Sequence, residues 1–187
     1  MHPDAWLVVI DPQRIFASPD SAWGSPMFPD IVEPVRRLAA AAGPRTVVTR
    51  WVPAADPQGS WEAYLQAWPF ADVEAGDPLL AVVPELADLV RRGHPVVSLP
   101  TFGKWGYALQ ALTGTAPHLV LTGVSTDCCV ISTALAAADA GATITVVTDA
   151  CAGSTPDNHD AAMQVMSLYP PQITLATSDE VLAGTTS

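Results

Sequence analysis

Residues 119–141 read LVLTGVSTDCCVISTALAAADAG and contain one complete α/β unit. The unit opens with the apolar run Leu119–Thr122, which is typical of a buried parallel strand. Small and apolar residues at helical spacing follow over Cys129–Ala140, and Gly141 stands where a helix commonly ends. The segment is therefore predicted to form a strand, a short turn and a helix.

The same alternation runs through the rest of the chain. Further strands are predicted at Trp6–Ile10, Thr46–Arg50, Val96–Leu99, Ile144–Thr148 and Ile173–Ala176. Further helices are predicted at Ile31–Ala42, Pro84–Arg92, Tyr107–Leu112 and Asp160–Leu168. We predict one α/β domain over residues 1–187, with an open parallel sheet, helices on both faces, and functional residues at the carboxyl ends of the strands.

Composition narrows the classes of partner. The formal net charge of -11 makes nucleic acid and anionic membrane surfaces unlikely partners, so a small molecule is expected. Only 14% of residues are charged and 49% are hydrophobic, which favours a homo-oligomer, a dimer or a tetramer, that shares apolar surface. The first residues, MHPDAWLVVIDPQ, resemble neither a signal peptide nor a membrane span, and an odd number of cysteines suits a reducing compartment. A cytoplasmic location is expected.

The stretch from Pro53 to Pro78 is too long for a simple connection and contains four aromatic residues, Trp61, Tyr64, Trp68 and Phe70. Such an insertion forms a lid or pocket wall in some proteins and a subunit contact or core edge in others. The sequence leaves both alternatives open.

Three residue types with useful chemistry follow predicted strands. Asp11 follows the first strand, where a carboxylate suits a general base, although Asp-Pro is also a common turn. Lys104 lies between Phe102 and Trp105 after the third strand, in a place where it can be partly desolvated. Cys129 lies near the start of a predicted helix, where backbone N–H groups stabilise a thiolate or an oxyanion.

The two adjacent cysteines cannot both face one pocket. Consecutive helical residues point about 100° apart, so one of Cys128 and Cys129 is expected to pack. A strained vicinal disulfide is the alternative. Cys151 is expected to be a small buried residue.

Four segments together resemble the isochorismatase-like cysteine hydrolases, a family that includes nicotinamidases and carbamoylsarcosine amidases. They are Asp11 with Gln13 and Phe16, the segment KWGYAL at 104–109, the block GVSTDCCVISTALAAADAG at 123–141, and VVTDACAG at 146–153. The resemblance implies a three-layer α/β/α fold with a Rossmann-like six-stranded parallel sheet in which strand one lies beside strand four.

The resemblance also implies a catalytic set. The family's nucleophile is the cysteine directly before a valine, which here is Cys129, with Asp11 as proton acceptor and Lys104 favouring the thiolate. A cis peptide is implied at Val124–Ser125, which directs the Ser125 N–H toward an oxyanion beside the Cys129 N–H. The implied reaction is hydrolysis of a small amide, ureide or carbamate C–N bond through a thioester acyl-enzyme.

The sequence departs from the nicotinamidases after the second strand, where those relatives carry an Asp-x-His metal pattern. The corresponding stretch TRWVPAADPQGSW has no histidine, so no metal or other cofactor is predicted, and nicotinamide is disfavoured as substrate. The substrate pocket is expected to be formed by aromatic residues, and Arg14 or Arg50 would meet a substrate carboxylate. The predicted pocket residues are Phe16, Trp23, Trp51, Trp61, Phe102 and Trp105.

The sequence is also compatible with functions other than amide hydrolysis. The chain could hydrolyse a vinyl ether as isochorismatases do, with Asp11 as the acid, or be a non-catalytic binding or thiol-sensing protein that uses Cys128 and Cys129. A Cys129–His159 dyad is a further alternative, although His159 is expected to be solvated or to cap a helix. His94 and His118, at strand entrances, are expected to be structural.

Overall fold

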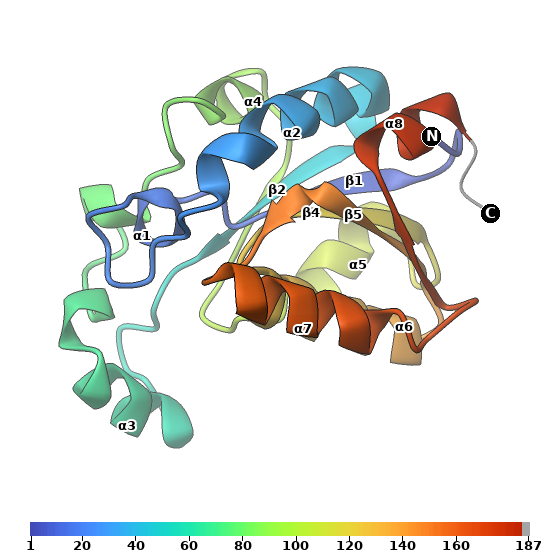
Figure 1. Ribbon diagram of the computed structural model, residues 1–187. Helices are drawn as coiled ribbons and strands as arrows, with labels where there is room; N and C mark the ends of the chain where they lie inside the picture. The colour runs from blue at the N-terminus through green and yellow to red at the C-terminus, as the bar shows by residue number, and fades with distance from the viewer. Residues whose placement is uncertain (185–187) are drawn as a thin grey trace.

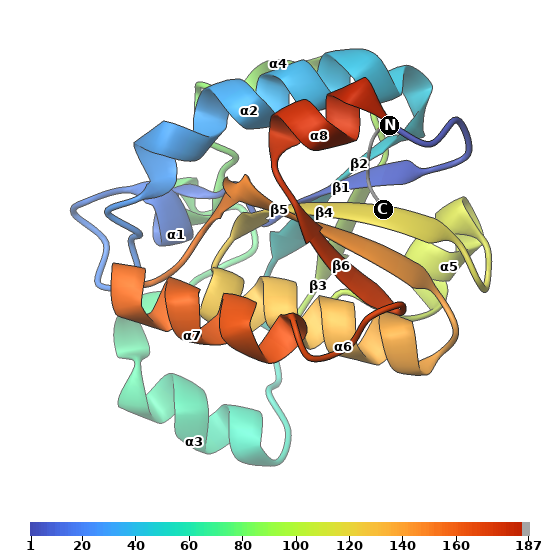
Figure 2. The same ribbon diagram turned by 45° about the vertical axis from the view of Figure 1, so that its right-hand side comes forward.

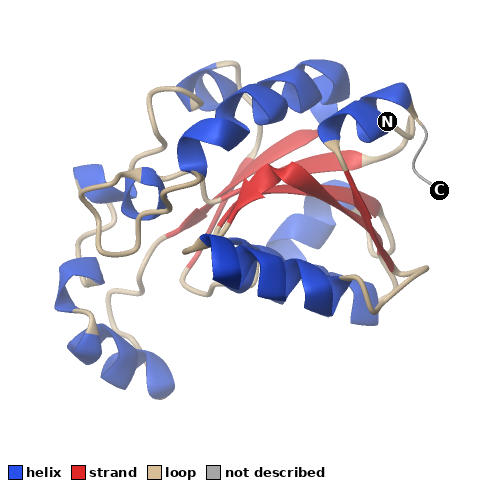
Figure 3. Ribbon diagram, in the orientation of Figure 1, coloured by secondary structure: helices blue, strands red, loops and turns tan. Residues whose placement is uncertain are grey.

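A computed structural model describes residues 1–184 of the chain. Its centre is a β-sheet, whose strands are red in Figure 3. The sheet has six parallel strands in the order β3-β2-β1-β4-β5-β6. The strands are β1 (Trp6–Ile10), β2 (Thr46–Trp51), β3 (Val96–Leu99), β4 (His118–Val124), β5 (Thr143–Ala152) and β6 (Ile173–Ala176). All six predicted strands are present, and β1 pairs with β4 as the resemblance implied.

Helices cover both faces of the sheet (Figure 1). They are α1 (Arg14–Ala17), α2 (Phe28–Ala42), α3 (Ser60–Ala67), α4 (Ala87–Arg91), α5 (Tyr107–Thr113), α6 (Ile131–Asp139), α7 (Pro156–Met166) and α8 (Ser178–Ala183). Helices α2, α4 and α8 lie on one face, and α5, α6 and α7 lie on the other (Figures 1 and 2). The three-layer α/β/α prediction is confirmed.

The strand β1 shows why two helical layers are needed. Its side chains alternate between faces, so Leu7 and Val9 pack into one hydrophobic cluster while Val8 and Ile10 pack into the other. All four side chains are fully buried, which an apolar run in a parallel sheet requires.

The largest difference from the sequence-based expectation lies after β4. The helix predicted from Cys129 begins only at Ile131, and Thr126–Val130 forms a π-helical turn in which the Val130 N–H donates to the Ser125 carbonyl. Strand β5 is also longer than predicted, because after a shift in register Cys151 and Ala152 pair with Gly123 and Val124. Both departures lie at the carboxyl end of β4.

The insertion after β2 leaves the three layers. Helix α3 stands beyond the carboxyl ends of the strands, at the end opposite the N-terminus (Figures 1 and 2). Its Trp61 and Tyr64 rings contact the Phe102 ring, with centroids 4.9 Å and 5.6 Å from it. No helix within residues 1–184 combines the length and apolar character needed to cross a membrane.

Candidate active site

A buried ion pair lies where β1 and β4 meet. The Nζ atom of Lys104 is 3.0 Å from Oδ2 of Asp11, and neither side chain has any exposed surface. Asp11 directly follows β1, and Lys104 lies in the connection between β3 and α5. Because burial of a lone charge is strongly unfavourable, each of the two side chains depends on the other.

The position of Asp11 is fixed by its neighbours. Its backbone N–H donates to Thr49 Oγ1 (3.1 Å), and the Thr49 hydroxyl donates to Asp11 Oδ1 (2.6 Å). Asp11 has a positive φ of 46°, and Gly123 on β4 lies so close that an added Cβ would be 2.1 Å from the Ile10 carbonyl oxygen. Only a residue without a side chain lets β4 approach Asp11 this closely.

Two hydrogen bonds hold Lys104 in place. Its Nζ donates to the Thr101 carbonyl (2.6 Å), and its backbone N–H donates to Thr133 Oγ1 (2.9 Å). The Thr133 hydroxyl in turn donates to the Cys129 carbonyl (2.7 Å). The Thr133 hydroxyl therefore links the backbone of Lys104 to the backbone of Cys129.

The Cys129 thiol completes the cluster. It is fully buried, and it interacts with the Asp11 carboxyl closely enough to lower the pKa of that group. Burial raises the pKa of Cys129 well above its usual value, the hydrogen bond to Cys128 and the charge of Asp11 raise it further, and Lys104 lowers it without cancelling the rise. This environment therefore favours the neutral thiol over the thiolate. Cys129 lies inside a buried π-helical turn and not at the N-terminus of an α-helix.

A neutral thiol needs a base, and Asp11 is placed to be one. Burial raises the pKa of the Asp11 carboxyl, while the charge of Lys104 and a hydrogen bond from Thr49 oppose the rise. A carboxylate with a raised pKa is a stronger base than an ordinary aspartate. Asp11 can therefore accept the Cys129 proton more readily than a solvated aspartate could.

The variant Thr49→Val tests this role of Asp11 through pH. Loss of the Thr49 hydrogen bond removes one influence that lowers the pKa of Asp11, so that pKa rises. Asp11 must be ionised to accept a proton, so the acidic limb of a kcat/KM profile, or of the Cys129 alkylation rate, should move to higher pH. An unchanged limb would show that another group controls it.

The peptide bond between Val124 and Ser125 is cis, as the resemblance implied. Ser125 follows β4 and its carbonyl accepts hydrogen bonds from the Cys128 and Val130 N–H groups. Val124 and Ser125 are both buried, and Ser125 lines a pocket.

A pocket of about 220 Å³ opens beside the cysteine turn. Its lining residues include Phe16, Trp23, Tyr64 and Phe102, together with Ser125, Asp127, Cys128 and Ser154. Three of the six predicted aromatic residues line it, namely Phe16, Trp23 and Phe102. The sequence patterns do not predict Asp127 or Ser154 as pocket residues, and they indicate Tyr64 only as one of four aromatic residues in the insertion after β2.

The other three predicted aromatic residues lie elsewhere. Trp51 and Trp61 line a neighbouring hollow of about 230 Å³. Trp105 is partly buried and packs against the second hydrophobic cluster.

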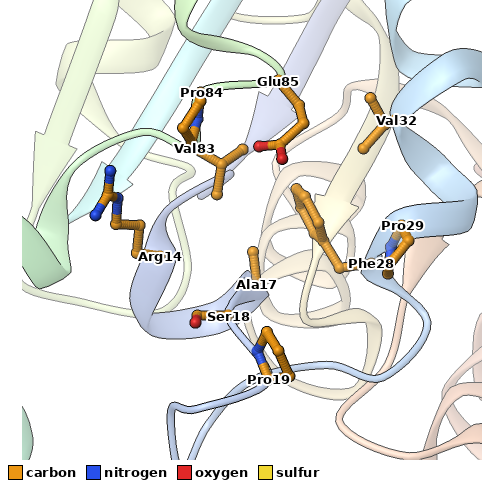
Figure 4. A pocket seen from close by; sticks show the side chains of 10 residues that line it. All are labelled: Arg14, Ala17, Ser18, Pro19, Phe28, Pro29, Val32, Val83, Pro84 and Glu85. Carbon is orange, nitrogen blue, oxygen red and sulfur yellow. The ribbon is translucent and has the colours of Figure 1, made fainter.

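Neither predicted arginine reaches the pocket. Arg14 lines a separate hollow of about 470 Å³ between α1, the start of α2 and Val83–Glu85 (Figure 4). Arg50 donates to the Leu80 carbonyl from Nε (3.3 Å) and Nη2 (3.2 Å). The expectation that one of them meets a substrate carboxylate is therefore not supported by their positions.

His159 differs from its predicted state. It is buried, and its Nδ1 lies 2.9 Å from Thr126 Oγ1. Helix α7 begins earlier than predicted, and its cap is Thr155, whose hydroxyl accepts from the Asn158 N–H. The prediction that His159 is solvated or caps the helix is wrong, because it packs against the cysteine turn. Cys151 is buried as expected, with its Sγ 3.6 Å from the Leu121 carbonyl.

The chain's residues do not fit the metal site of nicotinamidases. The stretch after β2 provides Asp56, which is exposed, and no histidine. Within the described part of the chain, no three His, Cys, Asp or Glu side chains gather where they could hold a metal ion. The absence of a catalytic metal stays a prediction.

Comparison with solved structures gives the same fold. A cysteine hydrolase from Pseudomonas syringae pv. phaseolicola 1448A has a TM-score of 0.80 at 20% identity, covering 98% of this chain and 93% of that one. An isochorismatase family protein from Desulfovibrio vulgaris subsp. vulgaris str. Hildenborough has a TM-score of 0.78 at 22% identity, with 96% and 98% covered. The nicotinamidase/pyrazinamidase PncA from Bacillus subtilis has a TM-score of 0.73 at 20% identity, with 92% and 98% covered.

No curated protein matches the chain in sequence. The isochorismatase domain model matches residues 5–180, which is most of the chain. The fold, the strand order and this match agree, and the chain belongs to the isochorismatase family.

Proposed function

We propose that this protein is a cysteine-dependent hydrolase that cleaves the C–N bond of a small amide, ureide or carbamate through a thioester acyl-enzyme. The observation that carries the proposal is the buried Asp11–Lys104 ion pair set against the Cys129 thiol. A nucleophile within hydrogen-bond reach of a base, which a third group orients, is the arrangement that covalent catalysis requires.

The first half-reaction forms the acyl-enzyme. Asp11 accepts the thiol proton while the Cys129 sulfur attacks the substrate carbonyl carbon, which gives a tetrahedral oxyanion. The Ser125 and Cys129 N–H groups are the proposed donors to that oxyanion. The C–N bond then breaks, the leaving nitrogen takes the proton from Asp11, and a thioester remains.

The second half-reaction restores the enzyme. Water attacks the thioester carbonyl carbon as Asp11 accepts a proton from it. The C–S bond breaks, the acid leaves, and the Cys129 sulfur regains its proton from Asp11. Lys104 keeps its charge throughout, holds Asp11 in place and offsets the negative charge that develops beside it.

Vinyl ether hydrolysis is the second candidate. Its supporting observation is the raised pKa of Asp11, which favours the protonated form that acid catalysis needs. In that reaction Asp11 would protonate the substrate, and Cys129 would only line the site.

Hydrolysis of a panel of small amides, ureides, carbamates and vinyl ethers tests the proposal, with ammonia or amine release as the main readout. Wild type is compared with Cys129→Ala and with the matched control Cys128→Ala, one residue away. We expect Cys129→Ala to reduce kcat by at least about 10³-fold, and Cys128→Ala, which changes the pocket lining but keeps the nucleophile, to reduce it far less. Equal activity in all three proteins, or turnover of a vinyl ether alone, would refute the acyl-enzyme mechanism.

A further inference from the structure

The pocket beside the cysteine turn is lined by Cys128, while its neighbour Cys129 is fully buried. The lining is of two kinds. One is a set of rings, here called the aromatic wall, made of Phe16, Trp23, Tyr64 and Phe102. Trp23 is its centre, since its ring contacts those of Phe16, Trp51, Tyr64, Trp68, Phe70 and Phe102 at centroid distances of 5.0 to 6.2 Å. Rings held by this many neighbours present fixed faces to a ligand.

The second part of the lining carries a carboxylate. Asp127, half-buried, lines the pocket together with Ser125, Cys128 and Ser154. Its Oδ1 accepts from the Ser154 N–H and its Oδ2 from the Ser154 hydroxyl, each at 2.7 Å. Within residues 1–184, no Lys, Arg or His nitrogen forms an ion pair with it. The charge of Asp127 raises the pKa of the nearby His159, but burial lowers that pKa by more, which favours the neutral imidazole. Among the described residues, Asp127 therefore has no Lys or Arg partner.

Lys104, Arg50 and Arg14 do not line this pocket. Lys104 is paired with Asp11, Arg50 donates to the Leu80 carbonyl, and Arg14 lines the separate hollow of Figure 4. A substrate carboxylate in this pocket would be desolvated beside Asp127 with no cation to receive it. A positive group would instead lie against ring faces and a carboxylate, both of which attract it. The chain's net charge of -11 also attracts a cationic ligand over a longer range.

We infer that the substrate is a small amide or ureide that carries an ammonium group, bound between the aromatic wall and Asp127 while its carbonyl carbon lies at Cys129. This inference rests on the proposed function, because it assumes that the pocket delivers a carbonyl to the thiol. It narrows the substrate to cationic compounds and sets anionic amides aside.

Two amides of equal shape separate charge from size. The first is 2-(trimethylammonio)acetamide, and the second is 3,3-dimethylbutanamide, in which a tert-butyl group replaces the trimethylammonium group. Binding of each is measured by calorimetry on the Cys129→Ala protein, which cannot turn them over by the proposed route. We expect the cation to bind at least about tenfold more tightly than its neutral isostere.

Two variants, each made in the Cys129→Ala background, assign that preference to its source. Asp127→Asn keeps the shape and the contact to Ser154 but removes the charge, and Phe102→Leu removes one ring face. Each should reduce the ratio of the two affinities, while binding of the neutral amide changes little. Because the ratio is measured within one protein, a general loss of folding cannot imitate this result.

The outcomes separate the inference from the proposed function. Equal or tighter binding of the neutral amide overturns the inference, and if wild type hydrolyses that amide through Cys129, the proposed function stands without it. Tighter binding of the cation, with Cys129-dependent hydrolysis of cationic amides, supports both. Tighter binding of the cation without hydrolysis of any amide in the panel overturns the assignment of that cation as substrate and the proposed function together.

Discussion

Replacing Lys104 with methionine is expected to lower the free energy of unfolding by about 3–5 kcal/mol. The reason is that Asp11 then stays fully buried with no opposite charge within reach, since Lys104 Nζ lies 3.0 Å from it in the wild type. Chemical denaturation of wild type and variant near neutral pH measures the difference. A loss below about 1 kcal/mol would mean that the pair is effectively solvated.

The double variant Asp11→Asn/Lys104→Met is the matched control for this prediction. It removes both charges and leaves side chains of similar size, so most of the lost stability should return. Activity should not return, because neither an acceptor for the thiol proton nor the cation remains. A double variant as unstable as Lys104→Met alone would show that packing around the lysine, rather than its charge, sets the loss.

Asp11→Asn is expected to lower kcat/KM by about 10²–10⁴-fold, the contribution typical of a general base. An amide has nearly the shape of the carboxylate but cannot take the proton from Cys129. Alkylation of Cys129 by iodoacetamide, followed in a Cys128→Ala background, provides a second readout and should slow in parallel. Unchanged alkylation with lost turnover would place Asp11 in a later step than thiol activation.

Much of the fold follows from local patterns in the sequence. The buried runs of β1 to β6 are found where Val, Ile and Leu gather, because a parallel strand covered on both faces needs continuous apolar residues. The meeting of Asp11, Lys104 and Cys129 follows from the same rule, since each comes after a strand and the strands end at one edge.

The details at that edge do not follow from local patterns. The π-helical turn at Thr126–Val130 and the burial of His159 depend on how β5 and α7 pack around the cysteines. Lys104 reaches Asp11, whereas the adjacent Trp105 packs against the second hydrophobic cluster and does not line the pocket. The rings that line the pocket come from three separate connections: Phe16 and Trp23 precede α2, Tyr64 follows β2 and Phe102 follows β3.

The most direct test of the account is to identify the residue that carries the acyl group. An amide that the panel shows to be turned over is mixed with enzyme, the reaction is quenched in acid during turnover, and the peptides are mapped by mass spectrometry. The account predicts an adduct with the mass of the acyl group on Cys129, removable by hydroxylamine, present in Cys128→Ala and absent in Cys129→Ala. An adduct on Cys128, or full turnover by Cys129→Ala, would contradict it.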